Sequence, residues 1–201
     1  MALMDKHVAV TPVGKDERGE TRAKARAAAG HNDWLAHIVR HHEQIEALFT
    51  VLLAAPDEPS RRQGLTELAL ILTAHANAEE AVIYPALVHF GHGPGEMLGY
   101  TQQAEAKAQL GELAYLDSMS PEFCRQLQIL RSAVLQHMNE EEGARLLALA
   151  ALPANEQELL TSRYLEEFER YTRFGNGRQT DAATARREAL SGGHILAAVI
   201  P

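Results

Sequence analysis

The sequence predicts an all-α protein built on an antiparallel, up-down-up-down four-helix bundle. In four long segments, apolar residues recur at alternating steps of three and four, the spacing of a helix that buries one face. Hydrophobic residues make up 46% of the 201 residues and aromatic residues only 5%, which favours helices over a β-sandwich. The connections between the four segments are short, which implies that neighbouring helices run antiparallel.

Residues 1–30 are expected to form an N-terminal arm outside the bundle. Charged residues alternate there without an apolar face until the alanine-rich stretch 23–29, and Gly30 closes it. A segment of this composition has little apolar surface to bury, so we expect a flexible or loosely docked extension. The bundle itself is assigned to residues 31–152.

The first two bundle helices have recognisable starts. The first is expected to start near Asn32 or Asp33, which are good N-caps, and to end at the AAPDEP segment, residues 54–59. The second is expected to start at Ser60, with Pro85 near its end. Their apolar stripes consist of Leu35, Ile38, His42, Ile45, Phe49 and Leu52, and of Leu68, Leu72, His75, Glu79 and Val82.

The third and fourth helices differ in polarity. The third, expected over about residues 96–116, is the most polar of the four. The fourth starts at Ser120 and Pro121, because serine caps a helix and proline favours its first position, and Pro153 stops it. Its apolar stripe consists of Phe123, Leu127, Leu130, Val134, His137, Glu141, Ala144 and Leu147.

Two further segments follow the bundle. Residues 153–174 are expected to form an additional helix, and residues 175–201 a tail that ends in the apolar patch HILAAVIP. We expect this tail to pack on a surface or on a partner. Together, the additional helix and the apolar patch suggest a homodimer.

Charge and cysteine content exclude several classes of protein. A formal net charge of −8 leaves no basic stripe that could follow nucleic-acid phosphates or an anionic membrane surface. The single cysteine, Cys124, excludes an internal disulfide and fits a reducing cytosol. Residues 1–20 contain no apolar core of signal-peptide length, and no run approaches the ~20 apolar residues of a membrane span. We therefore expect a soluble cytoplasmic protein that binds neither nucleic acid nor membrane.

Three histidines of the predicted bundle are each followed four residues later by a glutamate. The pairs are His42 with Glu46, His75 with Glu79, and His137 with Glu141. Residues four apart lie on one face of a helix, and each pair falls on or beside the apolar stripe of its helix. We therefore expect imidazoles and carboxylates to converge inside the bundle.

Buried groups of these two kinds indicate a metal site. Imidazole nitrogen with carboxylate oxygen suits iron, zinc or manganese, and a bridging carboxylate can hold two metal ions about 3.5–4 Å apart. An unpaired carboxylate in an apolar core is strongly disfavoured. Placing Glu79 and Glu141 among leucines therefore requires a positive charge between them, which a metal cation supplies.

Other polar residues have simpler interpretations. A single His-x-x-x-Glu pair occurs by chance on solvated faces, whereas two or three pairs in phase with apolar stripes are hard to explain in that way. Tyr84 and Tyr100 lie near the predicted bundle centre or its ends, where either could hydrogen-bond a metal-bound oxygen or quench a radical by oxidation. We favour the simpler interpretation, packing aromatics with their hydroxyls at the rim. The neighbouring carboxylates are expected to face outward, namely Glu43, Glu80, Glu140 and Glu142. The remaining histidines are expected to be ordinary hydrogen-bonded core or surface residues, namely His7, His31, His37, His41, His89, His92 and His194.

Three segments resemble the haemerythrin-like family, specifically the bacterial HHE cation-binding domains. They are HHEQIEALF at residues 41–49, HANAEEAVIYPAL at 75–87 and QHMNEEEGARLLAL at 136–149, and their order and spacing also match. The resemblance covers about residues 33–150. It implies an antiparallel four-helix bundle around a non-haem di-iron centre. Members of this family bind dioxygen, sense oxygen or iron, handle nitric oxide, or decompose peroxide.

The resemblance also implies a role for five residues. His42 would be the ligand from the first helix, and His75 and Glu79 those from the second. The fourth helix would contribute His137 and Glu141. The two glutamates would be the bridging carboxylates. His42 and His75 would serve mainly one iron, and His137 the other.

The third helix departs from the family pattern. The family commonly has a histidine there, and in this sequence Gln103 stands at that position, within TQQAEAKAQLGEL at residues 101–113. A glutamine oxygen is a much poorer ligand for a transition metal than an imidazole. Glu46, one turn from His42, is a candidate replacement, although a partly exposed place beside the stripe explains it equally well. The site is therefore expected to hold two iron ions or one, with zinc or manganese as other candidates.

Three functions remain open at this point. The first, which we favour, is a non-haem iron protein that binds or reduces a small oxidant such as dioxygen, hydrogen peroxide or nitric oxide. The alternative is a metal-dependent sensor or regulatory interaction module without turnover. The third is a bundle without metal, which the in-phase carboxylates argue against. Whether the protein is an enzyme is left open.

Overall fold

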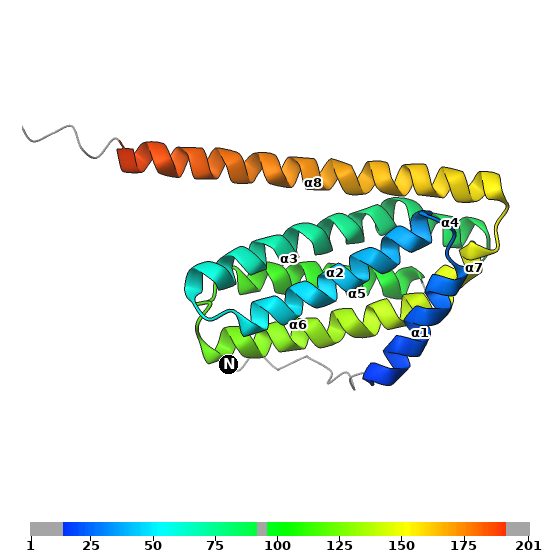
Figure 1. Ribbon diagram of the computed structural model, residues 1–201, viewed down its shortest axis with the longest axis horizontal. Coiled ribbons are helices and arrows are strands. Elements are labelled where there is room, and N and C mark those ends of the chain that lie inside the picture. The colour runs from blue at the N-terminus through cyan, green and yellow to red at the C-terminus, as the bar shows by residue number, and fades with distance from the viewer. Residues whose placement is uncertain (1–13, 92–95, 192–201) are drawn as a thin grey trace, which may run out of the picture.

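The described part of the protein is mainly helical. The computed structural model describes residues 14–91 and 96–191, and these residues contain no strand. The predicted all-α class is confirmed (Figure 1). The α-helices are α1 (Lys15–Ala28), α2 (Trp34–Ala54), α3 (Glu58–Ala78), α4 (Tyr84–His89), α5 (Glu96–Leu113), α6 (Pro121–Glu140), α7 (Leu146–Ala150) and α8 (Ala154–Ser191), and the π-helical turns are η1 (Glu79–Ile83) and η2 (Glu141–Arg145).

Four of the helices form the bundle. Helix α2 packs against α3 and α6, and α5 packs against the same two helices, so the four close a ring. In Figure 1 they lie side by side, with α8 along one side of them and α1 crossing near one end. The helical bundle predicted from the apolar stripes is therefore present, and its centre is enclosed by all four helices.

The starts of the bundle helices follow from side-chain capping. Asp33 caps α2 and Ser120 caps α6, each by accepting a hydrogen bond from the backbone amide three residues later. Both caps agree with the sequence prediction. Helix α3 starts earlier than predicted, because Asp57 is its cap and accepts from the backbone amide of Ser60.

Buried apolar side chains form two clusters rather than one. The first includes Trp34, Ile38 and Tyr164, and the second includes Ile45 and Phe49. Along α2 the change from one cluster to the other falls between Val39 and Ile45, and along α3 between Leu72 and Ala78. His42 and His75 lie within these two intervals. The apolar core is therefore interrupted by a layer of buried polar side chains.

Two π-helical turns interrupt the long helices at this layer. The turn η1 follows α3 and starts at Glu79, and η2 follows α6 and starts at Glu141. The sequence predicted uninterrupted helices here, because a stripe of steps of three and four does not reveal one extra residue in a turn. Such turns frequently occur at functional sites. Both glutamates stand where the backbone departs from α-helical geometry.

The N-terminal region differs from the loosely docked arm that was expected. Residues 15–28 form α1, which contacts α2, α6, η2 and α7, and Ala25 on this helix is fully buried. Its charged residues find partners on the bundle: Arg22 donates hydrogen bonds to Glu142 at 3.0 Å and to Glu46 at 2.9 Å. Part of the charge pattern therefore reflects ion pairing, while most of the other charged residues of α1 are exposed. Residues 1–13 lie outside the described residues.

The C-terminal helix is longer than expected. An additional helix was predicted over residues 153–174 with a tail from 175 to 201, whereas α8 continues to Ser191. Residues 192–201 of that tail lie outside the described residues. Helix α8 packs against α3, α2 and η1. Among the described residues, no helix is both long and apolar enough to cross a membrane.

Candidate metal centre

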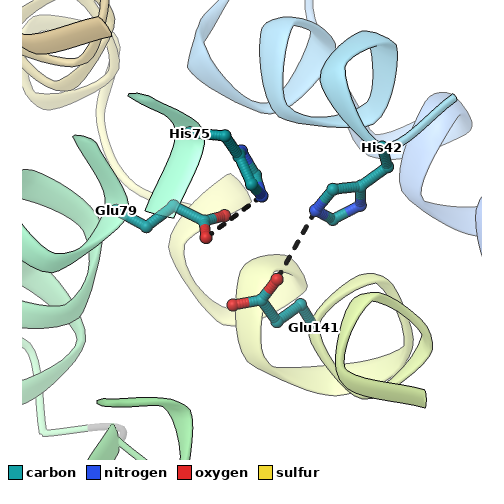
Figure 2. Close-up of side chains that lie close together, drawn as sticks. All are labelled: His42, His75, Glu79 and Glu141. Atoms are coloured by element: carbon teal, nitrogen blue, oxygen red, sulfur yellow. Dashed lines mark ion pairs between the residues drawn. The ribbon is translucent and has the colours of Figure 1, made fainter. Parts of the chain in front are cut away.

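Four side chains from four elements of the bundle meet at its centre. His42 comes from α2, His75 from α3, Glu79 from the start of η1 and Glu141 from the start of η2 (Figure 2). One nitrogen or carboxylate oxygen of each residue lies within 4.8 Å of those of the other three, and all four residues are buried. His75 Nε2 is 3.3 Å from Glu79 Oε2, and His42 Nε2 is 3.5 Å from Glu141 Oε2.

His137 extends this cluster on the far side of Glu141. Its Nε2 lies 3.3 Å from Glu141 Oε1, while the other oxygen of the same carboxylate faces His42. Tyr84 donates a hydrogen bond of 2.7 Å to Glu141 Oε1, and its hydroxyl is 3.4 Å from His137 Nε2. Glu141 therefore stands between two groups of donors.

Gln103 occupies the remaining side of the centre, on α5. It is buried, and its amide nitrogen donates to Glu79 Oε2 at 2.7 Å and lies 3.5 Å from His137 Nε2. The third bundle helix therefore brings an amide to the place between Glu79 and His137. Gln103 was a candidate ligand from the sequence, and the structure brings it into the site.

Each histidine of the site is held by its other ring nitrogen. His42 Nδ1 lies 2.7 Å from Glu142 Oε1, and His137 Nδ1 lies 2.8 Å from Gln102 Oε1. Both partners are acceptors, so each Nδ1 carries the proton. The Nε2 lone pairs of these two rings are then free to face the centre. This is the outer-shell arrangement that orients metal-binding histidines.

His75 is held by a tyrosine from the C-terminal helix. The Tyr164 hydroxyl lies 3.1 Å from His75 Nδ1 and 2.9 Å from His41 Nδ1. Burial, followed by the neighbouring His42, lowers the pKa of His41 to about 3, so His41 is neutral. With a proton on His75 Nδ1, as metal binding through Nε2 would require, the tyrosine hydroxyl donates to His41 Nδ1. The tyrosine oxygen can then accept from His75 Nδ1. His41 also stacks on Phe168 of α8. Helix α8 is thereby connected to the centre through Tyr164.

The two central carboxylates have opposite pKa shifts. Burial, followed by the charge of Glu141, raises the pKa of Glu79 well above its ordinary value. Burial also opposes ionisation of Glu141, but His137 and His42 outweigh it and hold its pKa well below the ordinary value. Without a cation, protonation of Glu79 is therefore favoured over protonation of Glu141. A bound cation would stabilise both carboxylates in the ionised form.

The residues present fit a metal cation. Within the described part of the chain, five buried atoms at this centre make no hydrogen bond: His42 Nε2, His75 Nε2, Glu79 Oε1, Gln103 Oε1 and Glu141 Oε2. Buried polar groups are almost always paired, so this concentration requires an explanation. Donors on opposite sides of one ion lie at most about 4.4 Å apart when each bond is about 2.2 Å. The 4.8 Å spread of the four-residue cluster is close to that limit.

Glu46 lies apart from this centre. Its carboxylate accepts from Arg22 at 2.9 Å and from Arg18 at 3.4 Å, and its side chain is 27% exposed. The structure therefore favours the partly exposed place beside the stripe over the candidate ligand role. Arg22 of α1 is the physical reason, because it draws the carboxylate away from the bundle centre.

Glu142 and Tyr84 correct two further expectations. Glu142 was expected to face outward, but it is buried between Arg22 and His42, because η2 turns two consecutive glutamates inward. Tyr84 was expected to place its hydroxyl at the rim, but the hydroxyl reaches Glu141 in the interior. The run of three glutamates at positions 140–142 was the sequence signal for the burial of Glu142. For Tyr84, its place near the predicted bundle centre was the sequence signal.

The comparison with protein families decides the classification. Residues 34–150 match the model of the hemerythrin HHE cation binding domain. The chain belongs to the hemerythrin HHE family. The match extends from the start of α2 to the end of α7, so α1 and α8 lie outside it. Two of the partners described above, Arg22 and Tyr164, are therefore contributed from outside the family domain.

One curated relative is also similar. The chain is 31% identical over 128 residues to a protein named DNA nickase from Nostoc sp. (strain PCC 7120 / SAG 25.82 / UTEX 2576). The match covers 63% of this chain and 35% of the relative, so the chain spans only about a third of that protein. No solved structure matches the chain. The site described above suits a metal cation, in agreement with the family.

Proposed function

We propose that this chain is a cytoplasmic non-haem iron protein that holds two iron ions and binds or reduces a small oxidant, namely dioxygen, hydrogen peroxide or nitric oxide. The metal-binding unit is the bundle of residues 31–152. The observation that carries the proposal is the concentration of unpartnered histidine nitrogens and carboxylate oxygens at the bundle centre. In a hemerythrin HHE domain such a donor set suits iron, and zinc or manganese are the competing metals.

The first metal position would lie between α2 and α3. His42 and His75 would bind through Nε2, because their Nδ1 atoms are held by Glu142 and by Tyr164. Glu141 Oε2 faces His42, and Glu79 Oε2 faces His75, so each histidine has a carboxylate beside it. Two neutral imidazoles and two shared carboxylates would neutralise most of the charge of a divalent ion.

The second position would lie on the α5 and α6 side of Glu141. His137 Nε2 and Glu141 Oε1 would supply one imidazole and one carboxylate oxygen. Gln103 would supply its unpartnered Oε1. This position has one histidine where the first has two, so we expect it to bind its metal more weakly.

The residues around the metal positions suit the binding of a small oxidant. When bound, iron supplies electrons and a coordination position that can accept a small oxidant. The Tyr84 hydroxyl, held on Glu141 at 2.7 Å, is a buried hydrogen-bond donor directed at the centre. Burial raises the pKa of Tyr84, followed by the charges of Glu141 and Glu79, so the phenol keeps its proton. Apolar clusters lie on both sides of the centre along the bundle.

The proposal is tested by reacting the reduced protein with each oxidant. The protein is loaded with ferrous iron under anaerobic conditions and mixed with hydrogen peroxide, dioxygen or nitric oxide while its absorption spectrum is followed. We expect a spectral change with at least one oxidant, and its loss in His75→Ala. His89→Ala is the matched control, because His89 is an exposed histidine. An iron-loaded protein that reacts with none of the three would contradict the proposal.

The alternative of a metal-dependent sensor without turnover is favoured by one contact. The Tyr164 hydroxyl connects a ligand histidine, His75, to a helix that lies outside the family domain. Loss of metal would free His75 and so loosen α8. Hydrogen exchange of α8 with and without metal distinguishes the two functions: a large change in exchange together with negligible peroxide consumption would favour the sensor.

Nucleic acid and a second copy of the chain are the other partners to consider. Its net charge of −8 argues against nucleic acid, but a relative named DNA nickase leaves that exclusion without support. Retardation of a DNA fragment at low salt measures it directly. A homodimer through α8 stays a prediction, which sedimentation equilibrium would check.

A further inference from the structure

A cavity of about 220 Å³ lies beside the candidate metal centre, between α3, α5 and α6. Its inner end includes His75, Gln103 and His137, which are residues of the centre. Its wall is largely apolar, with Leu72, Ala76, Leu98, Ala106, Val134 and Met138. The cavity therefore connects an apolar compartment to the side of the centre where Gln103 replaces the usual histidine.

The cavity is larger than a small oxidant requires. A water molecule occupies about 30 Å³ of liquid, and an apolar cavity of about 150 Å³ stays dry and binds benzene. A space of about 220 Å³ thus accommodates an organic molecule of roughly ten non-hydrogen atoms. A largely apolar pocket of this size that opens at the surface and ends at a few convergent polar groups has the usual form of a ligand-binding site.

One polar group at the inner end is left without a partner. Gln103 is only 3% exposed, and its amide nitrogen is used by Glu79. Its Oε1 makes no hydrogen bond with any described residue. A buried acceptor without a partner is unfavourable. A ligand with one O–H group would satisfy this oxygen.

The charges at the mouth of the cavity favour a neutral ligand. Lys107 lines the mouth, but its ammonium group is bound to Glu80 at 2.8 Å and to Asn77 at 3.2 Å. Glu105, which also lines the cavity, is exposed and carries the opposite charge. An anionic ligand would have to compete with Glu80 for the lysine, whereas a neutral ligand would leave that pair intact.

We propose that this cavity binds a neutral, largely apolar organic molecule that carries one hydroxyl or hydroperoxyl group, with that group directed at Gln103. The inference deepens the proposed function and rests on it for the metal that the group would meet. In the metal-free protein, binding uses the cavity wall and the amide alone, whereas a metal at the second position would compete with the ligand for Gln103 Oε1. Binding can therefore be measured with and without metal.

The probe is 2-phenyl-2-propanol, an aryl alcohol of suitable size with a single hydroxyl group. Its binding is measured by calorimetry on the metal-free and the iron-loaded protein, with isopropylbenzene as the analogue that lacks the hydroxyl. We expect saturable binding of the alcohol, and at least tenfold weaker binding of the hydrocarbon, because the latter leaves Gln103 Oε1 unpaired.

Substitutions on one helix distinguish the cavity from other sites. Ala106→Leu fills the cavity from α5, and we expect it to weaken binding of the alcohol at least tenfold. Ala104→Leu adds the same side chain on the exposed face of α5 and should leave binding unchanged. If Ala106→Leu does not fold, Ala133→Leu fills the cavity from α6 and gives the same comparison.

The outcomes separate this inference from the metal proposal. Alcohol binding that is lost in the cavity variant supports the inference even if the protein holds no iron. The inference is overturned if the folded protein fails to bind the alcohol in both states, or if Ala106→Leu and Ala104→Leu weaken it equally. Neither of these results would change the metal content on which the proposed function depends.

Discussion

The two halves of the candidate centre are built from different donors. The half between α2 and α3 has two histidines, and buried partners on η2 and α8 orient them. The half next to α5 and α6 has one histidine, an amide and a phenol, and the cavity opens on that side. Imidazoles and carboxylates bind transition metals more strongly than neutral amides or phenols. The comparison indicates one strong position and one weaker, accessible position.

The largest expected effect comes from removing the residue that both halves share. Glu141 directs one oxygen at His42 and the other at His137. We expect Glu141→Ala to abolish metal binding at both positions, measured as metal content after dialysis. Glu122→Ala removes an exposed glutamate from α6, the helix that η2 follows, and should keep the full content. If Glu141→Ala retained two metals per chain, the two halves would not share this carboxylate.

The second largest effect is expected from removing the hydroxyl group that orients His75 in the half between α2 and α3. Tyr164→Phe removes the hydroxyl that holds His75 Nδ1 but keeps the buried ring. Loss of such a partner typically lowers metal affinity about 10–100-fold, and we expect this loss at the first position. Competition with a chelator measures it. Tyr171→Phe, on the same helix, is the control; equal affinities in the two variants would show that α8 only covers the bundle.

A gain is expected in the weaker half. Gln103→His places an imidazole on α5, facing His137 and Glu79. We expect the second metal to bind at least about tenfold more tightly, since an imidazole is a better ligand than an amide. A chelator titration would show the two ions leaving closer together. An unchanged second step would mean that α5 does not contribute to that position.

The smallest effect concerns a glutamate outside both halves. Burial opposes ionisation of Glu46, but its hydrogen bond and charge pairing with Arg22 lower its pKa below the usual 4.5. The resulting stability is present above the unfolded pKa and is lost as the pH falls through the folded pKa. Glu46→Gln should therefore lower stability by under about 1 kcal/mol at pH 7, and by less at pH 3.

Urea unfolding at the two pH values measures this difference. The same variant should keep the metal content of the unchanged protein, because the Glu46 carboxylate is bound to Arg18 and Arg22. Loss of one metal per chain in Glu46→Gln would restore the ligand role that the sequence had left open.

The sequence predicts those features of the fold and the site that depend on residues close together in the chain. The stripe residues His42, His75 and Glu141 were expected inside because helical periodicity places them among leucines. The capping residues Asp33 and Ser120 were also predictable, because a cap binds a backbone amide only three residues later. These features depend on positions close together in the chain.

The contacts that the sequence did not reveal join distant segments. Glu142 was expected on the surface, but it is buried by an arginine 120 positions earlier. Tyr164 lies 89 positions from His75, on a helix whose relation to the bundle no local pattern defines. The π-turns at Glu79 and Glu141 were also missed, because they depend on packing in the whole bundle. Periodicity predicts which residues are inside, and tertiary packing determines which partners they find.

The most direct test of the account is the metal content per chain. It is measured by elemental mass spectrometry on protein produced in iron-replete medium without a histidine tag. The account predicts two iron ions per chain, one of which a chelator removes first. One metal per chain would contradict the second position at His137 and Gln103. A folded protein that holds no metal and is indifferent to chelator would contradict the metal centre itself.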